Sequence, residues 1–273
     1  MNDGERFPFL TCLCPTYGRP RLLENAIACF LAQDYPKDRR YLAILDDAGQ
    51  ISDQAGNGWS LHSGSTRFPS LPEKYNAIAM FGAPRHDTDV FVIWEDDDVY
   101  LPHHLSAHAA ALQGSAVCQR SATLHGDGWH TAHWSKPSRI LSTYTGKPEQ
   151  EGAAGRFFAS IAISRELWRQ VGGLPLTLRA DFDQQFLARL REVGGSPADP
   201  LDHSPERIPG YCFRWSSTGA YHGQGKMRSP EDETWWAACA LVEPREPVNE
   251  LHPRFDEETQ TIFKLTGDQH AKS

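Results

Sequence analysis

The chain has 273 residues, of which 40% are hydrophobic and 23% are charged. This size and composition fit one large globular domain, or one domain with a modest addition, and they supply enough apolar residues for a sizeable core. The formal net charge of −8 argues against a general nucleic-acid-binding protein, and no basic run is long enough to follow a phosphate backbone.

The lack of a recognisable targeting signal and the spacing of the cysteines predict a cytoplasmic protein. The sequence has no run of about 18 apolar residues, so we expect no transmembrane segment. Residues 1–6 lack the basic and then apolar pattern of a signal peptide. The six cysteines are scattered along the chain, which favours reduced core thiols over a disulfide framework or a zinc site. Nothing in the sequence indicates an oligomeric state.

The first 45 residues predict a strand, a helix and a second strand. Apolar residues 9–14 form the first strand, and Pro20 suits the first position of a helix whose apolar side chains recur up to Leu31. Residues 41–45 form the second strand. Because two parallel strands need such a crossover, this pattern predicts a right-handed parallel unit.

The next 70 residues continue the same alternation. Residues 50–72 are polar and rich in Gly, Ser and Pro, which predicts a long loop near a site. A helix is expected at about 72–81, a third parallel strand at 90–94, and another helix from about Pro102. The pattern indicates an α/β open sheet that binds ligands at the carboxyl ends of its strands.

The part of the chain after about residue 115 is less regular. Residues 117–119 are a possible strand, and residues 125–150 predict irregular structure or hairpins. Strands are expected at 157–163 and 211–215, a helix at 181–193, and a proline-rich loop at 196–210. Two further helices are expected around 235–241 and 257–265.

Two acidic clusters follow predicted strands. Glu95, Asp96, Asp97 and Asp98 end the third strand, and Asp46-Asp47 ends the second. Four adjacent carboxylates at the end of a buried strand are costly unless a cation neutralises them. Carboxylate oxygens suit Mg²⁺, Mn²⁺ or Ca²⁺, and Mg²⁺-type sites take further ligands from phosphates. The clusters therefore favour a site for a metal-bound phosphate ester, with a solvated acidic turn as the alternative.

Five segments together resemble the family 2 glycosyltransferases, which have the GT-A nucleotide-sugar-binding fold. The matching segments, in family order between residues 8 and 225, are 14–20, 45–49, 92–102, 171–174 with 181–189, and 213–215 with His222. The resemblance implies an α/β, Rossmann-like, mostly parallel open sheet flanked by helices, with an irregular acceptor-side half. It implies a glycosyltransferase domain over residues 1–225, comprising a nucleotide-binding half at about 8–115 and an acceptor half at about 116–225. Residues 226–273 are expected to form a C-terminal helical extension.

The resemblance also implies a pocket for a nucleoside-diphosphate sugar. The residues expected to bind this donor are Pro15, Thr16, Tyr17, Arg19, Asp46, Asp47, Lys74, Asn76, Asp96, Asp97 and Arg214. Asp47 is favoured over Asp46 as the acceptor of hydrogen bonds from the base or ribose. Many relatives have an Arg-Asn pair where this chain has Lys74-Tyr75-Asn76, so it departs from the family pattern there.

The acidic run at 95–98 corresponds to the family's aspartate-any-aspartate (DXD) metal motif. Asp96 and Asp98 are the favoured ligand pair, and a register shifted by one makes Asp97 a main ligand. His222 is expected as a third ligand. The implied ion is Mn²⁺ or Mg²⁺, which as a Lewis acid stabilises the charge of the leaving diphosphate. Arg214 or Lys226 is expected to pair with phosphate oxygens in a glycine-containing mobile segment.

Asp181 corresponds to the family's catalytic base, which is usually written Glu-Asp. Here Ala180 replaces the Glu, so the motif is incomplete. An aspartate at this position also suits the N-terminus of a helix, and the two roles are compatible. Asp183 is expected either to bind the acceptor or to cap the same helix.

These observations predict a metal-dependent, inverting, hexosyltransferase-like enzyme that moves a sugar to a carbohydrate or other hydroxyl acceptor. The alternatives are a metal-dependent nucleotidyltransferase and a catalytically inactive sugar- or nucleotide-binding relative, which Ala180 keeps open. His104 and His108 have a zinc-binding spacing but lack the usual protease Glu. Trp129 or Trp134 is a candidate for stacking on a sugar. The sequence leaves the donor base, the sugar and the acceptor open.

Overall fold

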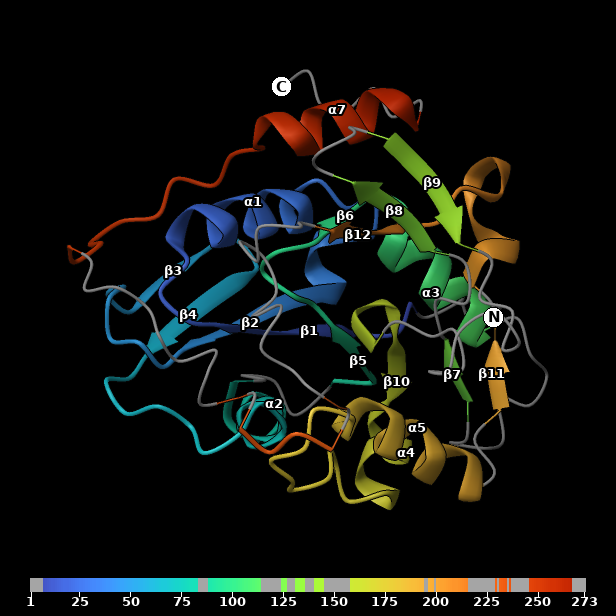
Figure 1. Ribbon diagram of the computed structural model, residues 1–273. Helices are drawn as coiled ribbons and strands as arrows, with labels where there is room; N and C mark the ends of the chain where they lie inside the picture. The colour runs from blue at the N-terminus through green and yellow to red at the C-terminus, as the bar shows by residue number, and fades with distance from the viewer. Residues whose placement is uncertain are drawn as a thin grey trace, which may run out of the picture.

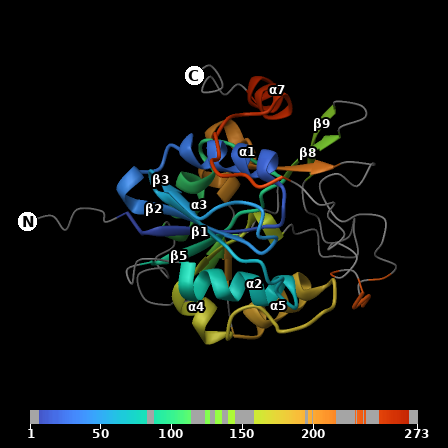
Figure 2. The same cartoon turned by 90° about the vertical axis from the view of Figure 1, so that its left-hand side faces the viewer.

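The computed structural model describes residues 7–82, 88–113, 124–126, 131–135, 140–144, 158–193, 196–198, 200–215, 229, 231–234, 236 and 246–266. These residues form a central sheet between two layers of helices (Figures 1 and 2). Helices α1 (Pro20–Leu31) and α3 (His104–Gln113) cover one face, and α7 (Glu257–Leu265) lies outside α1. Helices α2 (Leu71–Ala77), α4 (Arg165–Gln170) and α5 (Phe182–Glu192) cover the other face. The expected α/β open sheet flanked by helices is confirmed.

Eight described strands form the main sheet in the order β11-β7-β10-β5-β1-β2-β4-β3. Their bounds are β1 Leu10–Thr16, β2 Arg40–Asp46, β3 Gln54–Gly56, β4 Trp59–Ser63, β5 Val90–Ile93, β7 Leu124–Gly126, β10 Ala162–Ser164 and β11 Ser196–Ala198. The central strand β1 pairs in parallel with β2 on one side and β5 on the other. Every residue of β1 and β5 is buried because helices cover both faces, which explains their continuous apolar runs.

The strand order reverses beside β1. The chain passes from β1 through α1 to β2 and β4, and then returns through α2 to β5 on the opposite side of β1. The crossovers α1 and α2 lie on opposite faces of the sheet (Figure 1). A reversal of this kind opens a crevice at the carboxyl ends of the two strands, where α/β proteins bind ligands. The ends of β1 and β5 therefore locate the candidate site.

A smaller sheet begins directly after the acidic run. Its order is β6-β12-β8-β9, with bounds β6 Val99–Tyr100, β12 Tyr211–Trp215, β8 Thr131–Ser135 and β9 Ile140–Tyr144. Strand β12 pairs antiparallel with β6, which places Tyr211 opposite Tyr100. The acidic loop at 94–98 thus connects the main sheet to the smaller one.

The segment predicted as a long loop at 50–72 instead contains a β-hairpin. Strands β3 and β4 pair antiparallel, and β4 extends the main sheet by pairing with β2. Asn57 and Gly58 form the turn, with Gly58 at φ +79°, and this dipeptide is a strong hairpin signal that the loop prediction missed. Trp59 and Leu61 are buried in the core, whereas the alternating residues Ser60 and His62 are more exposed.

Other element predictions differ in detail. Residues 158–160 form a 3-10 turn, so the strand predicted at 157–163 shortens to β10. The proline-rich loop includes β11 and two 3-10 turns, Pro200–His203 and Pro205–Arg207. For residues 125–150, the pairing of β8 with β9 confirms the hairpin alternative. The possible strand at 117–119 and all but one residue of the helix predicted at 235–241 lie outside the described residues.

The described cysteines, Cys12, Cys14, Cys29 and Cys212, are buried free thiols, as the sequence predicted. Within the described ranges, no helix combines the length and apolar character needed to cross a membrane.

Candidate active site

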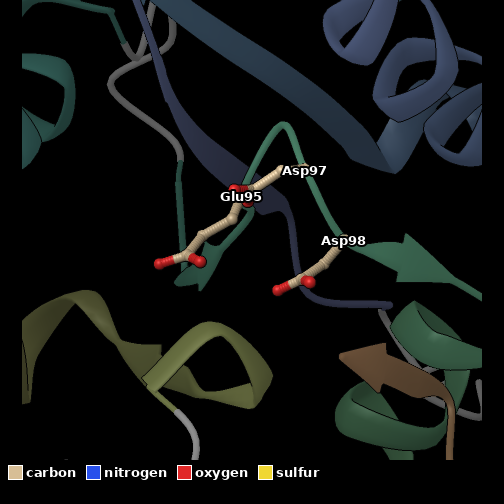
Figure 3. Close-up of side chains that lie close together, drawn as sticks. All are labelled: Glu95, Asp97 and Asp98. Atoms are coloured by element: carbon tan, nitrogen blue, oxygen red, sulfur yellow. The ribbon is translucent and has the colours of Figure 1, made fainter. Parts of the chain in front are cut away.

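Three carboxylates converge on the loop that connects β5 with β6. Oxygen atoms of Glu95, Asp97 and Asp98 all lie within 4.8 Å of one another. Figure 3 shows the three side chains extending from this loop, with Asp97 turned toward Glu95. The donor set consists of oxygens at the carboxyl end of a buried strand, so it fits Mg²⁺ or Mn²⁺. This grouping includes Asp97, as in the alternative register, and adds Glu95, which was not among the predicted ligands.

Asp96, the favoured metal ligand, makes its contacts elsewhere. Its carboxylate accepts hydrogen bonds from the Thr16 hydroxyl at 2.5 Å and from Arg19 Nε at 3.1 Å, and a second guanidinium nitrogen of Arg19 pairs with its other oxygen. Arg19 Nη1 also pairs with Asp97 Oδ2 at 2.8 Å. Asp96 therefore joins the acidic loop to the end of β1, and its role as a metal ligand stays a prediction.

The charge of the loop is only partly offset by Arg19. Burial raises the pKa of Glu95 well above its ordinary value, and repulsion from Asp97 and Asp98 adds to the effect. Burial also raises the pKa of Asp96, although Arg19 and the Thr16 hydroxyl oppose it. Each of these shifts means that the negative form is disfavoured in the metal-free protein. A bound cation would reverse that penalty.

Asp98 is held by residues far away in the sequence. The Tyr211 hydroxyl donates to Asp98 Oδ2 at 2.6 Å, and the backbone N–H of Arg214 donates to Oδ1 at 2.9 Å. Both donors lie on β12, which the pairing with β6 brings beside the loop. Sequence reasoning missed Tyr211 because no local pattern links it to a carboxylate more than 100 residues earlier.

The predicted donor pocket begins at the end of β1 and contains a buried ion pair. Pro15 and Thr16 are the last two residues of β1. Lys74 Nζ donates to the carbonyl of Thr16 and to the carboxylate of Asp47. Asp47 also accepts from the Phe68 N–H at 2.8 Å. Burial lowers the pKa of Lys74 from its ordinary value, and the Asp47 carboxylate opposes this shift.

Asp46 supports the loops around the same edge. Its carboxylate accepts hydrogen bonds from the backbone of Gly18 at 3.3 Å and Ala48 at 3.2 Å, and from the Ser63 hydroxyl at 3.0 Å. The two predicted acidic clusters, 46–47 and 95–98, therefore lie at the ends of β2 and β5, the two strands that flank β1. Whether Asp46 or Asp47 contacts a base or ribose stays a prediction.

Tyr17 lies in an aromatic stack that the sequence did not predict. The Arg67 guanidinium carbon lies 4.0 Å from the centroid of the Tyr17 ring and 4.2 Å from that of Trp236. Arg67 Nη2 donates to the Trp236 carbonyl at 3.2 Å, and the Trp236 indole N–H donates to the Phe68 carbonyl at 2.9 Å. This stack covers one face of the residue expected to line the nucleotide pocket.

Asn76 fixes the turn at residues 171–174. Its amide donates to the carbonyl of Leu174 at 2.9 Å and accepts from the N–H of the same residue at 2.8 Å. Gly173 adopts φ +73°, and a Cβ at this position would lie 2.5 Å from Asn76 Oδ1. Glycine is therefore required here for two reasons, and a donor contact by Asn76 stays a prediction.

Asp181, the predicted base, is partly exposed and paired. Its oxygens accept from Arg179 Nε at 2.9 Å and Nη2 at 2.7 Å, and from Gln185 Nε2 at 2.8 Å. The hydrogen bonds from Arg179 hold the pKa of Asp181 below its ordinary value, so this carboxylate is ionised at neutral pH. Asp183 is half-buried, and burial raises the pKa of its carboxyl.

Arg214 is fully buried, and its guanidinium contacts protein groups. Nε donates to the carbonyl of Asp97 and Nη1 pairs with Asp256, each at 2.5 Å. Its expected contact with phosphate stays a prediction.

Several predicted residues are not placed. His222 and Lys226 lie outside the described residues, as do Trp129 and the glycines of the expected mobile segment. Trp134 lies on β8, of whose side chains nothing is described.

His104 and His108 form part of the core. Both rings are buried, their centroids lie 4.6 Å apart, and His104 packs against Trp94 and Tyr100. Throughout the described part of the chain, Glu95, Asp97 and Asp98 form the one group of three or more side chains that could hold a metal ion. The zinc interpretation of the two histidines therefore has no support.

Comparison with known proteins gives matches to solved structures. No protein-family model matches the sequence. No curated protein matches it either. The S. aureus protein TarS (residues 1–349), in complex with UDP-GlcNAc, superposes with a TM-score of 0.55 at 11% identity over 97% of this chain and 73% of that one. The same TarS fragment with UDP gives 0.51 at 12% identity over 76% and 60%.

A mannosyltransferase from Pyrobaculum calidifontis, PcManGT, in complex with GDP-Man and Mn²⁺, gives a TM-score of 0.49 at 16% identity. That match covers 80% of this chain and 60% of the mannosyltransferase, so the chain spans less than two thirds of its length. At these identities the TarS likeness establishes the architecture rather than the activity. This chain has the fold of the GT-A-type glycosyltransferases, as the resemblance to family 2 predicted.

Proposed function

We propose that this protein is a metal-dependent, inverting glycosyltransferase that moves a sugar from a nucleoside-diphosphate sugar to an acceptor hydroxyl. The observation that carries the proposal is the convergence of Glu95, Asp97 and Asp98 at the strand-order reversal of a GT-A fold. That position is where such a sheet binds a ligand, and the donor set is one that binds a cation which can hold a diphosphate.

Glu95, Asp97 and Asp98 are the residues that would hold Mn²⁺ or Mg²⁺, with His222 as a further predicted ligand. When bound, the ion supplies Lewis-acid stabilisation of the charge that develops on the leaving diphosphate. Arg19 keeps Asp96 turned toward β1 and lies beside Asp97, so its cation is also close to where that charge develops.

The pocket for the nucleotide is proposed at the ends of β1 and β2. Tyr17 and Thr16 follow β1, and the Lys74–Asp47 pair fixes the backbone of Thr16 through its carbonyl. Solved structures with the same fold have UDP and UDP-GlcNAc bound, which supports a nucleotide-sugar donor for this chain. The donor base, the sugar and the acceptor are left open.

The transfer step is proposed to use Asp181 as the base. The carboxylate takes the proton of the acceptor hydroxyl while the acceptor oxygen bonds to the anomeric carbon. The bond between that carbon and the diphosphate oxygen breaks at the same time, and its electron pair leaves with the nucleoside diphosphate. A single displacement inverts the anomeric configuration, through a transition state that resembles an oxocarbenium ion.

Arg179 weakens Asp181 as a base. It donates to both oxygens of Asp181 and lowers the pKa of that carboxyl, so the carboxylate holds a proton less readily. Asp183, whose raised pKa makes it the stronger base, is the second candidate. The variants Asp181→Asn and Asp183→Asn separate the two, because only loss of the true base abolishes transfer while leaving donor binding intact.

The donor class can be tested by measuring release of nucleoside diphosphate from a panel of nucleotide sugars with and without Mn²⁺. We expect Mn²⁺-dependent release for one base and its loss in Asp98→Asn. Asp38→Asn, which neutralises an exposed carboxylate outside the site, serves as the matched control and should retain activity. Release of pyrophosphate from nucleoside triphosphates would show a nucleotidyltransferase instead. Binding of a nucleotide sugar without turnover would show an inactive relative.

The organisation of the chain and its location remain as proposed from the sequence. The boundary at about residue 225 and a cytoplasmic location are predictions, and the buried free thiols are compatible with a reducing compartment.

A further inference from the structure

Arg214 on β12 is a buried cation that contacts two separate parts of the molecule. Toward the acidic loop, its Nε donates to the carbonyl of Asp97 at 2.5 Å and its backbone N–H donates to Asp98 Oδ1 at 2.9 Å. Toward the C-terminus, its Nη1 donates to Asp256 Oδ2 at 2.5 Å, and Glu258 lies 3.9 Å away. Its side chain is 0% exposed, so its charge is costly unless these acceptors stay in place.

Asp256 is itself fixed from two directions. Its Oδ1 caps α7 by accepting from the Thr259 N–H at 2.7 Å, and its own N–H donates to Asn25 Oδ1 on α1 at 3.1 Å. Burial disfavours the charged form, but Arg214 and the Thr259 N–H outweigh it, so the pKa of Asp256 lies below its ordinary value. The carboxylate that meets Arg214 is thus ionised and held between two helices.

The segment that leads to Asp256 is attached independently of Arg214. The backbone of Val248 donates to the Gln50 carbonyl at 2.8 Å, and the N–H of His252 donates to Glu24 Oε1 on α1 at 3.0 Å. In Figure 1 this segment runs past β3 and along α1 to α7, in red. Loss of the single contact with Arg214 would therefore leave the segment docked.

We propose that Arg214 and Asp256 are positioning residues for a divalent-cation site, and that α7 thereby supports the geometry of Asp97 and Asp98. The inference rests on the proposed function, because it concerns the cation that the acidic loop would hold. The physical reason is that Arg214 contacts both ligands. Its guanidinium group fixes the main chain of Asp97, and its backbone N–H fixes the carboxylate of Asp98. Groups that orient metal ligands commonly control metal affinity without touching the ion.

The variant Asp256→Asn tests the proposal on the full-length protein. Asparagine has a similar size and is an equally good helix cap, so α7 keeps its N-terminus while the charge that faces Arg214 is removed. Glu257→Gln is the matched control, since it removes the same charge from an exposed neighbour in the same turn. Mn²⁺ binding to the metal-free protein, without nucleotide, is measured by isothermal titration calorimetry. We expect Asp256→Asn to weaken binding about 10- to 100-fold and Glu257→Gln to leave it unchanged.

Two further measurements separate positioning from general damage. Metal-free Asp256→Asn is expected to be less stable than the wild type, because buried Arg214 loses a charge partner, but it should still unfold in one cooperative transition above the assay temperature, because the rest of the segment remains attached. The Mn²⁺ concentration for half-maximal release of nucleoside diphosphate should rise, while the rate at saturating Mn²⁺ stays near that of the wild type. Arg214→Lys, which keeps the charge but cannot donate in two directions as a planar fork, should also weaken Mn²⁺ binding.

The outcomes distinguish the two proposals. If the wild type neither binds Mn²⁺ nor releases nucleoside diphosphate, the proposed function fails and this inference fails with it. If the wild type does both and Asp256→Asn binds Mn²⁺ equally well, the positioning role alone is overturned. An effect confined to the KM for the donor, with Mn²⁺ affinity unchanged, would also overturn it, because Arg214 would then act on the donor phosphates.

Discussion

Lys74 and Asp47 form a buried ion pair beside the end of β1, and removing the lysine charge should strongly destabilise the protein. Both side chains are 1% exposed. In Lys74→Met the aspartate keeps its hydrogen bond from the Phe68 N–H but loses its cation. The carbonyl of Thr16, which also accepts from Lys74, loses its partner as well.

The magnitude follows from the burial of the pair. Breaking a buried ion pair by removing one partner costs about 3–5 kcal/mol, because the remaining charge is left uncompensated. In a chain of this size each kcal/mol lowers the melting temperature by about 2–4 °C, so the midpoint should fall by about 10 °C. Replacing both partners is less costly than replacing one, so the double variant Asp47→Asn/Lys74→Met should recover about half of the loss.

Calorimetric and denaturant-induced unfolding of the wild type, the two single variants and the double variant provide the test. Lys37→Met, which removes an exposed lysine, is the matched control and should unfold like the wild type. A loss below about 1 kcal/mol in Lys74→Met would refute the reasoning, because that is the scale of an exposed pair. So would a double variant that is less stable than both single variants.

Three further variants test other features of the structure. Tyr211→Phe removes the hydroxyl that holds a carboxylate of the acidic loop, so Mn²⁺ binding measured by calorimetry should weaken about tenfold, and equal affinity would contradict this. Burial lowers the pKa of His108 to about 3 from 6.5, so the unfolded state binds the proton first and stability falls as the pH drops from 6.5 toward 3. This loss of stability is about 2 kcal/mol at pH 5, and it should be absent from the unfolding curves of His108→Gln. If the variant and the wild type show the same pH dependence, His108 is not its cause. Gly173→Ala should destabilise the protein more than Gly172→Ala, because both have positive φ but only the former meets Asn76; equal midpoints would contradict the clash.

The sequence alone predicted the parallel strands, the helices between them and the acidic run at the end of β5. These features are local, since apolar runs, helical periodicity and strand ends depend on residues that are close together in the sequence. Helix α7 was predicted with the same bounds, Glu257–Leu265, that the structure has. The β3–β4 hairpin was missed, because the polar composition of 50–72 outweighed the Asn57-Gly58 turn signal in the interpretation.

The sequence by itself determined that carboxylates would gather at the carboxyl edge of an α/β sheet, because parallel strands end on the same side. Only the tertiary structure decided which of them face one another. Arg19 draws Asp96 toward β1, whereas Tyr211 and Arg214 hold Asp98 from β12. These contacts join residues about 80 to 120 positions apart through the strand order and the packing of buried charges, and no local pattern records such pairings.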